Sequence, residues 1–90
     1  MPARRYIVSG RVQGVGFRYF VKTIAEAFDI SGSVSNRADG GVEIVAAGTL
    51  ENLRAFKEQV ELGPAGARVD RVETEHLPDE RYSGFAIVRQ

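Results

Sequence analysis

Two short segments of the sequence carry residue types suited to holding an anion. The first, GRVQGVGFRYF over residues 10–20, places Gly14 and Gly16 just ahead of Arg18. Glycines let the backbone approach a ligand closely, and consecutive N–H groups in front of a helix N-terminus form a cradle for an anion. A positive side chain in the first helical turn is mildly unfavourable beside the helix dipole, and a bound phosphate dianion would relieve that cost. A tight strand-to-helix turn with a solvated arginine explains the same residues.

A second segment, SGSVSNRADGGVE over residues 31–43, contains a side chain that could orient a water molecule. The amide of Asn36 can both donate a hydrogen bond to a water and accept one from it. An asparagine at the end of a strand also commonly forms a turn, because its side chain bonds nearby backbone groups. The segment alone leaves both interpretations open.

The glycine loop does not match the common nucleotide-binding motifs. It lacks the Gly-Lys-Ser/Thr ending of the P-loop. Tyr19 stands where the dinucleotide-binding fingerprint has its third glycine. The sequence therefore gives no support for a nucleotide ligand at this loop.

Periodic patterns predict the elements that position these residues. Alternation over residues 5–12 predicts a strand with one mostly apolar face. The next pattern predicts an amphipathic helix, whose apolar stripe is Phe17, Phe20, Val21, Ile24, Ala25 and Phe28. A weaker strand over residues 32–37 and a strand over residues 42–47 flank a turn signal, Ala38-Asp39-Gly40-Gly41.

The second half of the chain predicts one more helix and two more strands. Thr49 can cap a helix that has Glu51 in its first turn and that ends at Gly63-Pro64. The apolar stripe of that helix is Leu50, Leu53, Phe56 and Val60. Residues 69–77 indicate a strand whose phase breaks once, as a bulge would cause, and residues 82–88 indicate a short last strand.

This order of elements predicts an α+β fold, a ferredoxin-like βαββαβ sandwich that forms a single domain over residues 1–90. An antiparallel sheet with a short fifth strand is covered on one face by two helices. The first β-α-β connection returns the chain parallel to the first strand, so both strands end at the same edge of the sheet. The loop over residues 13–18 and Asn36 leave the two strands there, and we expect them to meet in space.

Composition excludes several kinds of function. Twelve Lys and Arg balance twelve Asp and Glu, so no overall field attracts nucleic acid or an anionic membrane. The absence of cysteine excludes disulfides, a thiol nucleophile and a zinc–thiolate site. No apolar run approaches the roughly 20 residues of a membrane span, and the start of the chain does not read as a signal peptide. We therefore expect a soluble, cytoplasmic domain without a metal site.

Other polar and aromatic side chains have ordinary interpretations. The single histidine, His76, is expected at the surface, and Tyr19 and Tyr82 are expected in the partial core. Charges that alternate in sign from Arg68 to Glu75 predict an exposed, ion-paired strand face, where each pair contributes little to stability.

Taken together, the two segments resemble the acylphosphatase family. VSGRVQGVGFR, residues 8–18, matches the first signature of that family in full, and residues 32–48 match most of the second. The ending YSGFAIVRQ looks like the last strand of the family, so the resemblance spans nearly the whole chain. The second signature departs at Ser33, where an aromatic residue or threonine is usual, and at Ser35, where a basic residue is common.

The resemblance implies a reaction and a set of site residues. It implies that Arg18 binds the substrate phosphate together with the loop of Gln13, Gly14, Val15, Gly16, Phe17 and Arg18, and that Asn36 positions the attacking water. The implied reaction is hydrolysis of an acyl phosphate, a small-molecule partner, to a carboxylate and inorganic phosphate, without metal or cofactor. We also expect the enzyme to be cytoplasmic and a monomer.

Two other functions compete with this one. The alternative is a non-catalytic module on the same fold that binds phosphate or carbamoyl phosphate. Single-stranded RNA binding ranks lower, although RNA-recognition domains share the topology. Those domains place exposed aromatic residues on the sheet, whereas the strand over residues 42–47 has none and the net charge is zero. We therefore expect no nucleic-acid partner.

Overall fold

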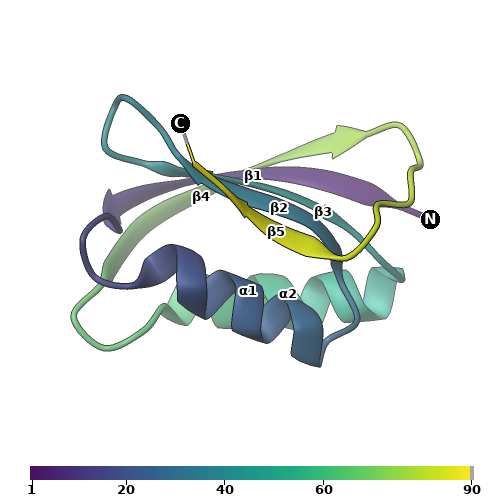
Figure 1. The fold of residues 1–90 in the computed structure, drawn as a ribbon, viewed down its shortest axis with the longest axis horizontal. Coiled ribbons are helices and arrows are strands. Elements are labelled where there is room, and N and C mark those ends of the chain that lie inside the picture. Colours follow the sequence, from purple (N-terminus) through teal and green to yellow (C-terminus); the bar gives the residue numbers. More distant parts are fainter. Residues whose placement is uncertain (90) are drawn as a thin grey trace.

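Residues 1–89, the part of the chain that the computed structural model describes, form five strands and two helices (Figure 1). The elements in chain order are β1 (Ala3–Arg11), α1 (Phe17–Ala27), β2 (Ser31–Asn36), β3 (Val42–Ala47), α2 (Leu50–Leu62), β4 (Arg68–Leu77) and β5 (Phe85–Val88). Both helices lie on one face of a single sheet (Figure 1), as the order of elements predicts. None of the helices in the described part is long and apolar enough to cross a bilayer.

The sheet has the strand order β4-β1-β3-β2-β5. The first four strands pair antiparallel, as expected, but β5 pairs parallel with β2, so the sheet as a whole is mixed. The expected antiparallel sheet is therefore confirmed for four strands, and the short fifth strand departs from it by pairing parallel. The cause lies in the segment over residues 78–84, which carries the chain from the β4 edge to the opposite edge. The strand that follows therefore runs back alongside β2 instead of forming a hairpin with β4.

Alternation of side chains explains how the sheet meets the helices. Tyr6 and Val8 of β1 and Val42 and Ile44 of β3 are buried against α1 and α2, while the intervening residues are more exposed. Apolar residues at helical spacing supply the other half of the core, namely Phe17, Val21, Ala25, Leu53, Phe56 and Val60. Each fully buried Val, Leu or Phe side chain among them contributes about 1.5–3 kcal/mol.

Two apolar side chains expected at least partly inside are exposed instead. Leu50, the first residue of α2, has 59% of its surface accessible, because side chains in the first turn point back past the start of the helix. Tyr19 has 72% of its surface accessible, since it lies two residues after the buried Phe17 and so on the outer side of α1. His76 is exposed and Tyr82 is half-buried, as expected.

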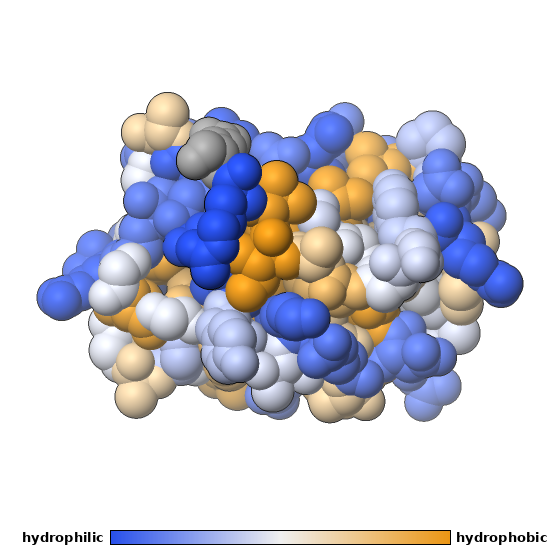
Figure 2. All heavy atoms as spheres, viewed as in Figure 1, coloured by the Kyte–Doolittle hydropathy of each residue, from blue (hydrophilic) through white to orange (hydrophobic). Residues whose placement is uncertain are grey.

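The edge strands differ in how they meet the solvent. The pairing of β1 with β4 shifts between Ser9 and Gly10, so that Asp70 is the extra residue of a bulge in β4, as the broken phase predicts. A Cβ on Gly10 would come within 2.1 Å of the Arg68 carbonyl oxygen, so this crossing requires glycine. Figure 2 shows apolar side chains over the other edge strand, β5, flanked by hydrophilic ones.

Candidate active site

Two adjoining hollows lie at the end of the sheet where β1, β2 and β5 finish. The larger has a volume of about 350 Å³ and is lined by Arg18, Asn36, Arg37, Ala38, Val88 and Arg89. The smaller has a volume of about 150 Å³ and adds the loop residues Gln13, Gly14, Gly16 and Phe17, together with Val12, Tyr19 and Ile87. Arg18, Asn36 and Arg89 line both hollows, which we therefore treat as one site and call the edge site.

The loop between β1 and α1 brings backbone N–H groups to the edge site. Gly14 and Gly16 have φ values of 73° and 75°, in the left-handed region that favours glycine. Gly16 is the N-cap of α1, and no side chain caps the helix there. The backbone hydrogen bonds found outside helices and strands within residues 1–89 include none donated by residues 14–18. These donors, at the positive end of α1, are therefore available to an anion.

Asn36 reaches the same site from the last position of β2. Side chains of a strand alternate between faces, so Asn36 lies on the helix side with the buried Val34, and Ser33 and Ser35 lie on the opposite face. Asn36 Oδ1 is buried and has no hydrogen-bond partner among the described residues. Buried polar atoms are nearly always bonded to protein or water, so this oxygen is placed to accept a hydrogen bond from a water in the site.

Positive charge dominates the edge site. Its lining includes Arg18, Arg37 and Arg89, and no carboxylate of the described residues lines either hollow. Arg37 is committed elsewhere, because its guanidinium contacts Asp39 at 3.1 Å and Glu43 at 3.2 Å. No ion pair of Arg18 or Arg89 with a carboxylate is found within residues 1–89. These two arginines therefore carry the charge that a substrate would meet.

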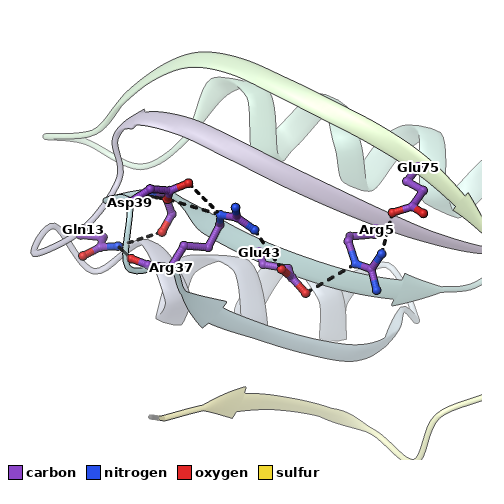
Figure 3. Close-up of polar contacts among 7 residues, drawn as sticks. Arg5, Gln13, Arg37, Asp39, Glu43 and Glu75 are labelled. Carbon is purple, nitrogen blue, oxygen red and sulfur yellow. Dashed lines mark hydrogen bonds and ion pairs between the residues drawn. The ribbon is translucent and has the colours of Figure 1, made fainter.

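The pairs of Arg37 belong to a chain of ion pairs on the open face of the sheet (Figure 3). From β4 to the β2–β3 turn the chain runs Glu75, Arg5, Glu43, Arg37 and Asp39. The Gly41 N–H, 2.9 Å from Asp39 Oδ1, and the Arg37 guanidinium hold the pKa of the Asp39 carboxyl below its usual range. Asp39 thus stays ionised at neutral pH and fixes the turn that follows Asn36.

The side chain of Gln13 does not point toward the N–H groups of residues 14–18, which we call the anion cradle. Its Nε2 donates to the carbonyl oxygens of Arg37 and Gly41, at 2.9 and 2.8 Å (Figure 3). Whatever Gln13 gives to an anion must come from its backbone. Val15 also turns away, because it packs against the hydrophobic core and lines neither hollow.

The structure brings together most of the residues singled out from the sequence and adds one that was missed. Gln13, Gly14, Gly16, Phe17, Arg18 and Asn36 all line the edge site. Arg89 was missed because nothing in its local sequence marks it. Its position follows from the parallel register of β5, in which Val88 pairs with Ser35 and so sets Arg89 beside Asn36. Within residues 1–89 no cluster of His, Cys, Asp or Glu side chains is arranged to hold a metal ion.

The fold and the edge site define a ferredoxin-like domain with an arginine-lined cradle for a small anion. Comparison with known proteins gives the family. The acylphosphatase family model matches residues 4–87. An acylphosphatase of Koribacter versatilis is 46% identical over 93% of this chain and 77% of its own length. One from Actinobacillus succinogenes is 42% identical over 99% of this chain and 100% of its own.

Solved structures agree with these matches. The crystal structure of acylphosphatase from Bacillus subtilis superposes with a TM-score of 0.95 at 43% identity, covering 98% of this chain and 99% of that one. A part of full-length HypF, 12% of that chain, matches 97% of this one with a TM-score of 0.86 at 30% identity. The chain belongs to the acylphosphatase family, and its activity is the hydrolysis of small acyl phosphates.

Proposed function

We propose that the edge site hydrolyses the acyl phosphate without a metal ion, with Arg18, the amides of residues 13–18 and Asn36 as its working parts. The observation that carries this proposal is the buried, unpartnered Asn36 Oδ1 in the same hollow as Arg18 and the uncapped start of α1. One wall of the hollow suits a phosphoryl group, and the other suits a water molecule.

The phosphoryl group is bound by charge and by geometry. The planar guanidinium of Arg18 can donate two parallel hydrogen bonds to phosphate oxygens. The loop amides can donate to the remaining oxygens, and the dipole of α1 adds to their effect. Fixed donors of this kind stabilise the charge on the equatorial oxygens in the transition state, which is the part that magnesium plays in many phosphoryl-transfer enzymes.

The attacking water is oriented by Asn36. Oδ1 accepts a hydrogen bond from the water, whose oxygen then forms a bond to phosphorus while the bond between phosphorus and the acyl oxygen breaks in line. The leaving group is a carboxylate, whose conjugate acid has a pKa of about 4, so it departs without a proton. The water gives its proton to a phosphate oxygen, and the products are a carboxylate and inorganic phosphate.

The oligomeric state, domain organisation and location are also proposals. We expect a single domain, because one core cluster joins elements from β1 to β5. We expect a monomer, because the two edges of the sheet are poor templates for pairing: β4 is lined with exposed ion pairs and β5 is only four residues long. Sedimentation would test this. We also expect the protein to act in the cytoplasm.

The test is hydrolysis of benzoyl phosphate in ¹⁸O-water with excess EDTA. We expect rapid hydrolysis by the wild-type protein with the label in phosphate, because the water attacks phosphorus. Asn36→Ala should lower kcat about 10²-fold, which is the usual scale for losing one transition-state contact. Asn52→Ala on α2 is the matched control and should be unchanged.

Three outcomes would contradict the proposal. Label in benzoate would mean attack at the acyl carbon. Loss of activity in EDTA that returns with added magnesium would mean that a metal is required. Phosphate binding by a folded wild-type protein with no turnover would favour a non-catalytic binding module instead.

A further inference from the structure

The side-chain amide of Gln13 joins the two halves of the edge site. It leaves the loop between β1 and α1 and donates to the carbonyl oxygens of Arg37 and Gly41, the two ends of the turn that follows Asn36. We propose that Gln13 is a positioning residue that sets the distance between the phosphoryl cradle and the water held by Asn36. This inference rests on the roles proposed above for the cradle and for Asn36.

The turn does not need Gln13 in order to close. The Gly41 carbonyl already accepts a hydrogen bond from the Arg37 N–H at 2.9 Å, and the Arg37 carbonyl accepts one from the Gly40 N–H at 3.2 Å. Each carbonyl oxygen has two lone pairs, and Gln13 occupies the second. Removing the Gln13 amide therefore leaves no buried carbonyl without a partner. Its two bonds serve to join the loop to the turn.

The acceptors of these bonds are held rigidly. Asp39 Oδ1 accepts from the Gly41 N–H at 2.9 Å, and the ion-pair chain ties Arg37 to Glu43 of β3. A Cβ on Gly41 would lie 2.7 Å from the Val8 carbonyl oxygen, so the turn rests directly on the backbone of β1. The turn is therefore a fixed support, and Gln13 ties the loop to it.

The loop itself has few other anchors near the cradle. A Cβ added to Gly14 or Gly16 would meet nothing within 4 Å, so the space beside the loop is open at these two points. Val15 packs against the core and Gln13 reaches the turn, and both flank Gly14. Losing the Gln13 contacts would let the cradle move relative to Asn36. A misplacement of about 1 Å between reacting groups costs on the order of 10²-fold in rate.

Binding and turnover should respond differently to this loss. Phosphate affinity depends on Arg18 and the loop amides, which move together. Turnover depends in addition on the distance from the loop to Asn36, which the two hydrogen bonds of Gln13 are proposed to set. We therefore expect Gln13→Met, which keeps the length of the side chain without its donors, to lower kcat for benzoyl phosphate about 10- to 100-fold. The Kd for inorganic phosphate should stay within about threefold.

The matched control is Gln59→Met on α2, a half-buried glutamine that lines neither hollow of the edge site. Gln13→Glu is a second variant, since a carboxylate has no hydrogen to donate to the two carbonyls, and it should be at least as slow as Gln13→Met. Amide hydrogen exchange of residues 14–18 gives a readout that needs no turnover. It should be several-fold faster in both Gln13 variants than in the Gln59 control.

Two results would overturn the proposal that Gln13 sets the distance between the loop and Asn36. One is a Gln13→Met protein whose kcat and loop exchange both match the control. The other is a parallel loss of kcat, phosphate affinity and melting temperature, which would give Gln13 a role in folding alone. A wild-type protein without turnover would count against the proposed mechanism only, because the exchange measurement would still decide whether Gln13 holds the loop.

Discussion

Helix α2 begins with a side-chain cap, whereas α1 begins without one. Thr49 precedes α2, and its hydroxyl oxygen accepts a hydrogen bond from the Asn52 N–H at 3.1 Å. Glu51 adds a favourable charge in the first turn. Gly16 precedes α1 in the left-handed region, no side chain caps it, and its first turn holds Arg18 in place of an acid. The N–H groups at the start of α2 are thus partly bonded by its own residues, whereas those at the start of α1 have no side-chain cap.

The two starts lie at opposite ends of the sheet, since β1 leads into α1 and the antiparallel β3 leads into α2 (Figure 1). The open start shares its end of the sheet with Asn36 and Arg89. The same backbone chemistry, a row of unpaired N–H groups, therefore has two uses. At α2 these N–H groups are bonded within the chain and contribute stability, whereas at α1 we propose that they are left free to bind the substrate, at some cost in stability.

Of the variants that test the difference between the two helix starts, Arg18→Gln should have the largest effect on activity. We expect kcat/KM for benzoyl phosphate to fall about 10³-fold or more, as when an arginine that stabilises a transferring phosphoryl group is removed. The melting temperature should not fall, because a positive charge in the first turn opposes the dipole of α1. Steady-state kinetics and thermal unfolding measure the two effects. Arg54→Gln, an exposed arginine of α2, is the control.

Inorganic phosphate sharpens the same comparison. A ligand that binds only the folded state at 100 times its Kd raises stability by about 2.7 kcal/mol. Phosphate should therefore raise the melting temperature of the wild-type protein and of Arg54→Gln, but not that of Arg18→Gln. Near-normal turnover by Arg18→Gln would show that the open start of α1 is not where the substrate binds.

Arg89→Gln should have a smaller effect at the same end of the molecule. Arg89 is exposed, so its charge is screened by solvent and each contact with phosphate is worth about 1 kcal/mol or less. We expect KM and the inhibition constant of phosphate to rise about three- to fivefold, with kcat nearly unchanged. The difference should shrink as salt is raised. Arg81→Gln, on the segment before β5, is the control. Equal KM values for the two variants would show that Arg89 does not contribute to substrate binding.

The fold could be predicted almost entirely from the sequence, because local patterns decided it. Alternation in β1 and β3, the apolar stripe of α1 and the Thr49 cap each specify their element without reference to the others. The direction of β5 could not be predicted in this way. It depends on the segment over residues 78–84, which crosses to the far edge of the sheet, and no local pattern records that crossing.

The edge site likewise contains some features that the sequence predicts and others that depend on the assembled sheet. The topology predicts that the 13–18 loop and Asn36 meet, and the structure brings them into one hollow. The Gln13 contacts with Arg37 and Gly41 span 24 and 28 residues, and the place of Arg89 follows from the register of β5. Such contacts depend on the assembled sheet. The exposure of Tyr19 was missed although the helical pattern places this residue on the outer side of α1, opposite the apolar stripe.

Thr49→Ala should give the smallest effect on activity and complete the comparison from the other helix. Losing the cap leaves the Asn52 N–H without its acceptor and should cost about 1 kcal/mol of folding free energy. For a chain of this size that corresponds to a melting temperature lower by about 4–8 °C. Turnover should be unchanged, because α2 begins at the end of the sheet away from Asn36.

Thr23→Ala is the matched control, since the Thr23 hydroxyl bonds the Tyr19 carbonyl within α1 and caps nothing. A Thr49→Ala protein with normal stability and reduced kcat would mean that the capped start of α2 also supports the active site, and the division between the two ends of the sheet would fail.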